Sequence, residues 1–238
     1  MQRMMGYVRR AADDYQMIEA GDSIAVGVSG GKDSFALLAA LHAMRRFYPL
    51  PYSIIAVTVD PCFGRQDTDY SLVTEWCTAR GIPHIIKRSE LATIIFDERK
   101  ETNPCSLCAR MRRGMLHDMA KENNCNKLAL AHNRDDAVET LMMNLFLGGR
   151  LSCFQPVTYL SRKDLTMIRP LVLAPERDII ACVRRNGFPV VKSPCPVDKK
   201  TMREDTKHML TELEQKYGYD DLAKRIFGAI RRSGIDGW

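Results

Sequence analysis

Six consecutive residues of this chain carry the groups that phosphate binding needs: Ser29, Gly30, Gly31, Lys32, Asp33 and Ser34. An apolar run at 24–28 precedes them, and an apolar pattern with helical spacing follows from residue 35. A strand, a glycine turn and a helix in this order direct free backbone N–H groups, a helix N-terminus and a lysine toward one anion. We therefore predict a cradle for the phosphates of a nucleotide.

This hexapeptide differs from the kinase-type P-loop, because Val26 stands where that motif has its first glycine and Asp33 follows the lysine. It resembles instead the PP-loop of the N-type ATP pyrophosphatases. These enzymes cleave ATP between the α and β phosphates and leave AMP on an oxygen of the substrate. In a simpler alternative, Ser34 or Asp33 only caps a helix and the glycines only make a tight turn.

The cysteines form the second group of reactive side chains. Cys105 and Cys108 form a Cys-x-x-Cys pair at the start of a predicted helix, where the helix dipole and nearby arginines favour thiolates. Cys195 lies between two prolines, in a rigid segment suited to holding one ligand. An iron–sulfur cluster, a dithiol or persulfide mechanism and a zinc site all remain open for this triad. We expect the others to be small buried apolar side chains: Cys62, Cys77, Cys125, Cys153 and Cys182.

The composition indicates an ordinary globular protein. The chain has 238 residues, of which 45% are hydrophobic and 27% charged, enough for one good-sized α/β core. With no apolar stretch of about 18 residues and no apolar leader, we expect a cytoplasmic protein without a membrane partner. The net charge of +6 is compatible with a polyanionic partner. The basic residues cluster at Arg110, Arg112 and Arg113, at Lys199, Lys200 and Arg203, and at Arg231 and Arg232.

Alternating strand and helix patterns predict an α/β fold, a Rossmann-like doubly wound parallel sheet. An N-terminal helix ends before Gly21; strands are expected at 24–28, 53–59, 83–86 and 127–131, and helices at 34–47, 69–80, 106–123 and 135–147. Helices at 175–186, 201–216 and 219–233 complete the chain. Ligands bind at the carboxyl ends of such strands, where the hexapeptide, Asp60 and the segment after Ala131 fall.

We predict three parts. Residues 1–20 form a helix packed on the main domain, residues 21–172 form the nucleotide domain with the Cys-x-x-Cys helix, and residues 173–238 form a helical region with the third cysteine.

Over nearly its whole length the chain resembles the TtcA-like tRNA 2-thiocytidine synthetase family, within the PP-loop superfamily. The similar segments follow the family's order: 14–22, the hexapeptide, 105–114, 131–136, 168–171 and Cys195. Asn133 differs, because the family has a second histidine there, and Cys195 is followed by Pro196 where the family often has a second Cys-x-x-Cys.

The resemblance implies an ATP- and Mg²⁺-dependent sulfurtransferase with a 4Fe–4S cluster, which replaces the C2 oxygen of cytidine 32 in a tRNA anticodon loop. It implies that ATP is bound by Ser29, Gly30, Gly31, Lys32, Asp33, Ser34, Asp60, His132, Asp135 and Asp136. The implied catalytic residues are Lys32, Asp60, Asp135, Arg112, Cys105, Cys108 and Cys195, with the three cysteines as cluster ligands.

The implied partners are tRNA and a sulfur donor, either free sulfide or a cysteine desulfurase, and a homodimer is left open. Three alternative functions are consistent with the sequence. One is a 2-thiouridine-type thiolase, and one is a PP-loop ligase that joins an amine to an adenylated carbonyl. The last is an RNA-binding module with iron–sulfur or zinc and no ATP turnover.

Overall fold

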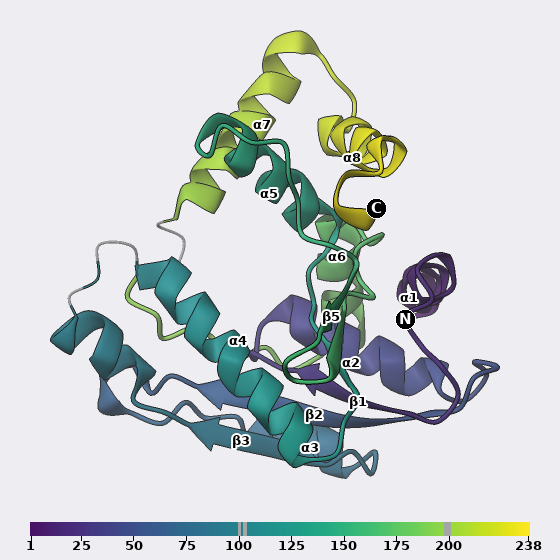
Figure 1. Ribbon diagram of the computed structural model, residues 1–238, viewed down its shortest axis with the longest axis vertical. Coiled ribbons are helices and arrows are strands. Elements are labelled where there is room, and N and C mark those ends of the chain that lie inside the picture. The colour runs from purple at the N-terminus through teal and green to yellow at the C-terminus, as the bar shows by residue number, and fades with distance from the viewer. Residues whose placement is uncertain (100, 102–103, 198–200) are drawn as a thin grey trace.

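The computed structural model describes residues 1–99, 101, 104–197 and 201–238. A six-stranded sheet in the order β3-β2-β1-β4-β6-β5 forms its centre (Figure 1). All neighbouring strands are parallel except β5 and β6, which pair antiparallel. The strands are β1 (Asp22–Gly27), β2 (Tyr52–Asp60), β3 (His84–Arg88), β4 (Lys127–Ala129), β5 (Val157–Leu160) and β6 (Leu165–Ile168).

Helices bury both faces of the sheet, which explains why the central strands are continuous apolar runs. Along β1, Ile24 and Val26 point into one core and Ala25 into the other, as the two-residue period of a strand requires. The first core contains α1 (Gln2–Asp14), α2 (Lys32–Met44), α3 (Ser71–Thr78) and α6 (Glu176–Asn186). The second contains α4 (Pro104–Glu122) and a π-helical segment at Thr93–Glu98.

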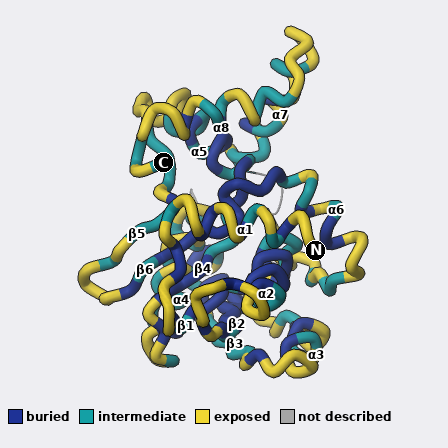
Figure 2. Tube along the Cα trace, turned by 90° about the vertical axis from the view of Figure 1, so that its right-hand side faces the viewer, coloured by how far each residue is buried: buried dark blue, intermediate teal, exposed yellow. Residues whose placement is uncertain are grey.

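The C-terminal helices form a layer away from the sheet. α7 (Met202–Tyr217) and α8 (Leu222–Ser233) pack on α5 (Arg134–Phe146), at the top of Figure 1. In Figure 2, α2 is buried in the body of the molecule while α7 extends outward with exposed residues. On α8, Phe227 and Ile230 face the core, whereas Arg231 and Arg232 are exposed. No helix among the described residues is both long and apolar enough to cross a membrane.

The predicted alternation of strands and helices is confirmed, with two differences. The first helix ends at Asp14, before Met17 and Ile18, which are buried in the segment leading to β1. The hairpin of β5 and β6 was not predicted, because each strand has only four residues and offers little periodicity. Two short 3-10 turns, at Phe63–Arg65 and Ile235–Gly237, complete the fold.

Candidate functional site

The glycine-rich hexapeptide connects β1 to α2, as its flanking patterns predict. Gly31 is the N-cap of α2, so Asp33 and Ser34 lie inside the first turn and neither caps the helix. The Ser34 Oγ donates to the Gly31 carbonyl at 2.9 Å and accepts from the Ser29 N–H at 3.1 Å. These bonds close the loop over the N-terminus of α2, where the free N–H groups and the dipole attract an anion.

Gly30 is required by its surroundings as well as by its backbone. Its φ is +83°, and a Cβ at this position would lie 2.9 Å from the Val191 Cβ and 3.2 Å from the Tyr70 Cε1. The Val191 N–H also donates to the Gly30 carbonyl at 2.9 Å. The loop is therefore packed directly against the segment that leads to Cys195.

A Gly30→Ala variant is expected to unfold at a clearly lower temperature than wild type, because the methyl group adds a clash with the Val191 and Tyr70 side chains to the strain of a positive φ. Gly81→Ala is the matched control, since Gly81 has a φ of +64° and nothing within 4 Å of the added methyl group. The unfolding free energy of the control should fall only by the cost of a left-handed backbone conformation at a non-glycine residue, about 1–2 kcal/mol. Equal losses of unfolding free energy for both variants in urea titrations would contradict the close packing.

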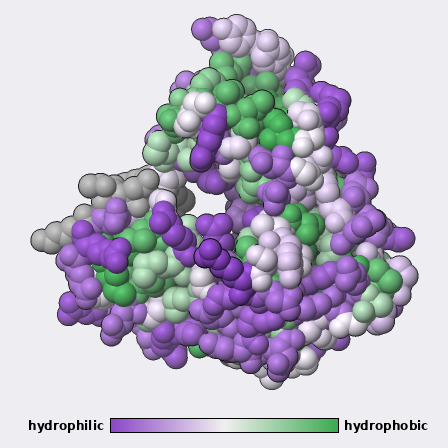
Figure 3. Space-filling model, viewed as in Figure 1, coloured by the Kyte–Doolittle hydropathy of each residue, from purple (hydrophilic) through white to green (hydrophobic). Residues whose placement is uncertain are grey.

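A cavity of about 420 Å³ opens beside the hexapeptide, between α4 and the start of α5. Figure 3 shows an opening through the molecule between these helices. Many of the predicted site residues line the cavity: Ser29, Gly31, Asp33, Ser34, Arg112, His132 and Asp136. Arg113, known from the sequence only as part of a basic cluster, lines it as well. Four predicted residues are not among the lining residues: Gly30, Lys32, Asp60 and Asp135.

Lys32 is held by two carboxylates at the edge of this cavity. Its Nζ lies 2.8 Å from the Asp33 Oδ2 and 2.9 Å from the Glu176 Oε1. Burial opposes the charge, but the bonds to both carboxylates outweigh it and raise the pKa of Lys32. Glu176 also accepts from Lys207 at 2.6 Å. Sequence reasoning missed Glu176, because a glutamate in the first turn of a helix has an ordinary explanation there.

His132 lies in the cavity as a neutral imidazole. Burial, together with the positive charges of Arg169, Arg203 and Arg113, lowers the pKa of His132 to about 3. Its Nδ1 is shielded from solvent and has no hydrogen-bond partner among the described residues. The imidazole ring can therefore form a hydrogen bond with a ligand, but it does not carry a positive charge near neutral pH.

Asn133, where the resembling family has a histidine, caps α5. Its side chain accepts from the Asp135 and Asp136 N–H groups, and its own N–H donates to the Asp136 Oδ2 at 2.9 Å. The Asn133 Nδ2 also donates to the Asp33 Oδ1 at 3.3 Å. This capping box fixes the Asp136 carboxylate beside the first turn of α2.

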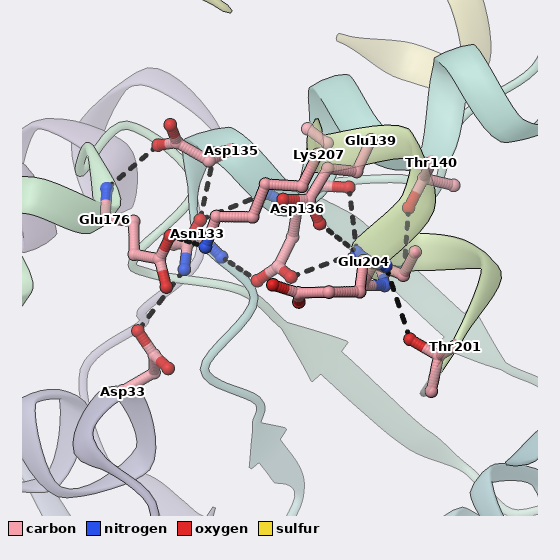
Figure 4. A network of polar contacts seen from close by, with 12 residues as sticks. Asp33, Asn133, Asp135, Asp136, Glu139, Thr140, Glu176, Thr201, Glu204 and Lys207 are labelled. Carbon is pink, nitrogen blue, oxygen red and sulfur yellow. Dashed lines mark hydrogen bonds and ion pairs between the residues drawn. The ribbon is translucent and has the colours of Figure 1, made fainter. Parts of the chain in front are cut away.

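A network of polar side chains ties α7 to this region (Figure 4). The Arg203 Nη1 donates to the Asp136 Oδ1 at 3.0 Å and to the Glu139 Oε2 at 3.1 Å, and Nη2 donates to the Thr140 Oγ1. Lys207, one turn further along α7, reaches Glu176. The network joins residues 31 to 67 positions apart, so no local sequence pattern could reveal it. Lys199 and Lys200, predicted to share a basic cluster with Arg203, lie outside the described residues.

Glu139 makes the stability of this network depend on pH. Burial and the charge of Asp136 raise the pKa of Glu139 to about 7 from 4.5, although Arg203 opposes the shift. The folded state thus binds the proton more tightly than the unfolded chain, and this stabilisation is lost as pH rises from about 4.5 through 7. We expect the unfolding free energy of wild type, relative to Glu139→Gln, to fall by about 3 kcal/mol over that range. Urea denaturation of both proteins at several pH values measures the two unfolding free energies. A difference between them that does not change with pH contradicts the prediction.

Asp60 and Asp135, both predicted to contact ATP or its metal, are engaged elsewhere. Asp60 is fully buried at the end of β2, where it accepts hydrogen bonds from Thr68 and from the Cys62 N–H. Asp135 accepts from the Glu176 N–H at 2.8 Å and so ties α5 to α6. Both carboxylates organise the segments around the cavity.

The three predicted cysteines meet at a second cavity of about 390 Å³. Cys105 and Cys108 stand in the first two turns of α4, as predicted, and Cys195 approaches from the segment before α7. Cys105 is exposed and the other two are half-buried. The remaining walls include Phe63, Phe96, Arg112, Ser193, Thr201 and Glu204.

The expectation that this environment favours thiolates is wrong for the protein alone. Burial and the charge of Cys195 raise the pKa of the Cys105 thiol. At Cys108, burial and the charges of both other sulfurs also raise the pKa, although Arg112 opposes the shift. The helix N-terminus is outweighed mainly by burial and, to a smaller extent, by the mutual repulsion of thiolates that lie close together.

This mutual repulsion fits a shared cationic group, since metal ions are bound by deprotonated thiols. A tetrahedral zinc ion, with Zn–S bonds of about 2.3 Å, holds its sulfurs only about 3.8 Å apart. The Sγ atoms of Cys105, Cys108 and Cys195 do not all lie within 4.8 Å of one another. The donor set and the cavity volume of about 390 Å³ thus fit a thiolate-bound iron–sulfur cluster, which is larger than a single ion.

A third cavity, of about 160 Å³, is a neighbour of the other two. It shares Ser29, Gly31 and Arg112 with the cavity at the hexapeptide, and Phe63, Arg112 and Ser193 with the cysteine cavity. Arg112 borders all three cavities. The phosphate cradle and the cysteines therefore lie at neighbouring cavities, and Arg112 lines every one of them.

The PP-loop domain family model matches residues 7–214. The chain is 42% identical to the tRNA-cytidine(32) 2-sulfurtransferase of Geobacter metallireducens over 87% of this chain and 81% of the relative. It is 40% identical to the protein of the same name from Geotalea uraniireducens, over 90% of this chain and 85% of the relative.

Among solved structures, the U34-tRNA thiolase NcsA from Methanococcus maripaludis, determined with its 4Fe–4S cluster, has a TM-score of 0.75 at 23% identity. The match covers 97% of this chain and 77% of that one, and shows that the two share a fold. Taken together, the extent of the family match and the identity to these relatives show that the chain belongs to the PP-loop domain family and, within it, to the tRNA-cytidine(32) 2-sulfurtransferases.

Proposed function

We propose that this protein uses ATP to replace the C2 oxygen of a tRNA cytidine, at position 32 of the anticodon loop, with sulfur. The family relationship gives the reaction. The structural observation that carries the proposal is that three neighbouring cavities share lining residues, with Arg112 common to all of them. A thiolase must bring an activated oxygen and a sulfur to the same carbon, so it needs the phosphate cradle and the cysteines in one connected space.

ATP would lie in the cavity of about 420 Å³ with its β and γ phosphates on the hexapeptide. The N–H groups of Gly30 and Gly31 and the Lys32 ammonium would stabilise the departing pyrophosphate, while Ser29 and Ser34 hold phosphate oxygens. His132, which is neutral, would contact the nucleotide through a hydrogen bond. Lys32 would exchange its bond to Glu176 for a phosphate oxygen, and Lys207 would keep Glu176 paired.

Asp136 and Asp33 are our first choices for orienting the Mg²⁺ that accompanies ATP, because both line the cavity. Burial raises the pKa of Asp136, and Arg203 opposes that shift. A divalent cation at this point would favour the ionised form and compensate the cost of burial. Asp60 and Asp135 would act indirectly, through the segments they hold.

The reaction has two steps. The cytidine O2 attacks the α-phosphorus, an O–P bond forms, and the bond to the β-phosphate oxygen breaks with release of pyrophosphate. A sulfur nucleophile then attacks C2, and the C–O bond breaks as AMP leaves. Arg112, which faces both cavities, would stabilise the negative charge of the α-phosphate during both steps.

Cys105, Cys108 and Cys195 would hold the 4Fe–4S cluster, which when bound supplies one iron without a protein ligand, able to bind sulfide. Free sulfide or a cysteine desulfurase would serve as the sulfur donor.

We also propose that residues 1–20, 21–172 and 173–238 form three structural units. The proposed assembly is a homodimer, which light scattering would test.

The test is anaerobic reconstitution with iron and sulfide, followed by incubation with ATP, Mg²⁺, sulfide and unmodified tRNA. Mass spectrometry of the digested nucleosides should show 2-thiocytidine, formed together with AMP. A different thionucleoside would keep the chemistry and replace the substrate, as in a 2-thiouridine thiolase. Formation of AMP together with an amine adduct on the tRNA would favour a PP-loop ligase. If neither AMP nor a modified nucleoside forms, the protein would be an RNA-binding module without ATP turnover.

A further inference from the structure

The cavity of about 160 Å³ has walls suited to a single flat ring. Phe63 and Tyr70 contribute aromatic surfaces, and Pro61 and Pro194 contribute apolar ones. The Phe63 ring is backed by Phe96, with the ring centroids 6.1 Å apart in an edge-on arrangement. Aromatic and proline surfaces of this kind hold bases that have been taken out of a helical stack.

The polar groups at this cavity include two cations. The polar side chains that line it are Ser29, Thr68, Tyr70, Arg112, Lys192 and Ser193. The neutral cytosine base presents O2 and N3 as acceptors on one edge, and a guanidinium offers only donors. Arg112 is thus matched to the edge that carries the reacting oxygen. The Arg112 guanidinium lies close enough to the Cys108 thiol to oppose the rise in its pKa, and among the described residues no carboxylate forms an ion pair with Arg112.

We propose that this cavity is the subsite for the target pyrimidine base, with Phe63 and Tyr70 as its stacking walls. The assignment rests on the proposed thiolase function and specifies where its RNA substrate is held. A base in this position has the phosphate cradle on one side, across Ser29 and Gly31, and the cysteines on the other, across Phe63 and Ser193. Its C2 carbon then faces both reactants.

Asp60 is the positioning residue of this subsite. Its buried carboxylate accepts from the Cys62 N–H at 3.1 Å, from the Thr68 N–H at 2.8 Å and from the Thr68 Oγ1 at 2.9 Å. These bonds close the segment 61–68, which supplies Pro61, Phe63 and Thr68 to the cavity. Asp60 thus has a structural role in the segment that lines the cavity.

Photo-crosslinking locates the base without depending on turnover. An anticodon stem-loop RNA with 5-iodocytidine at position 32 is bound to the reconstituted protein and irradiated, and the crosslinked peptide is identified by mass spectrometry. We expect the crosslink within 61–70, at Phe63 or Tyr70. A crosslink confined to any other segment, or bound RNA that gives none, overturns the assignment.

Variants test the stacking wall separately. Phe63→Ala is expected to raise the KM for tRNA about tenfold, since one base–aromatic stack is lost, and to leave ATP affinity and iron content unchanged. Phe47→Ala is the matched control, because Phe47 is an exposed phenylalanine at the end of α2. Asp60→Asn should also reduce the crosslink yield at 61–70 with unchanged ATP binding. Unchanged tRNA KM and crosslink yield in both Phe63→Ala and Asp60→Asn contradict the subsite.

Failure of the subsite is distinguishable from failure of the function. Wild-type protein that forms thiocytidine but crosslinks elsewhere would retain the thiolase and discard the subsite. Wild-type protein that forms no thionucleoside, under conditions in which the RNA is bound, would discard both.

Discussion

Replacing Lys32 with methionine is expected to lower kcat/KM for ATP-dependent thiolation by roughly 100- to 1000-fold. The Lys32 ammonium stands at the phosphate cradle, paired with Asp33 and Glu176. Without it, these carboxylates face the incoming phosphates with no cation between them. Methionine is unbranched and only one heavy atom shorter than lysine, so the loss reports mainly the missing ammonium group. The measurement is the rate of AMP and pyrophosphate release in the presence of tRNA.

Lys163→Met is the control for Lys32→Met. Lys163 is exposed and forms a surface ion pair with Asp118, 2.7 Å away, which contributes little to stability. It should retain wild-type rates. A Lys32→Met enzyme with a rate within threefold of wild type would show that the cradle acts through backbone groups alone.

Replacing Cys195 with alanine is expected to abolish thiolation and to lower the iron bound after reconstitution to a small fraction of the wild-type amount. Cys195 is the one member of the triad outside α4, so its loss leaves only the adjacent pair to hold the cluster. Loss of a ligand removes much of the binding free energy of a metal site. Iron and sulfide content, visible absorption and nucleoside analysis measure the effect.

The control for Cys195→Ala is Cys182→Ala, because Cys182 is buried in α6 and does not line the cysteine cavity. It should keep the cluster and the activity. Binding of an ATP analogue by Cys195→Ala, measured by calorimetry, should match wild type, because Cys195 does not line the ATP cavity. A Cys195→Ala protein that retains iron and makes thiocytidine would falsify the three-cysteine assignment.

The sequence predicted those parts of the site that are continuous along the chain. The hexapeptide lies between β1 and α2 because its glycines and hydroxyls are local features with local consequences. Cys105 and Cys108 lie on one helix because their spacing is one helical turn. The central parallel strands followed from their apolar runs, whereas β5 and β6, with four residues each, did not.

The third cysteine and Arg112 were named from the sequence, but their common cavity is a product of the fold. Cys195 reaches the start of α4 because the segment before it packs on the hexapeptide through Val191 and Gly30. Such a contact depends on two backbones that the sheet brings together, and no spacing along the chain encodes it.

By itself, the sequence determined the α/β alternation, the phosphate cradle and the identity of the candidate ligands, because each of these depends on near neighbours along the chain. Only the tertiary structure decided how acidic side chains of similar appearance are used. Asp136 lines the ATP cavity, whereas Asp60 accepts hydrogen bonds from the 61–68 segment. Glu176 binds both Lys32 and the α7 residue Lys207. Which group a carboxylate meets is set by long-range packing, since a buried charge must find its partner wherever the fold places one.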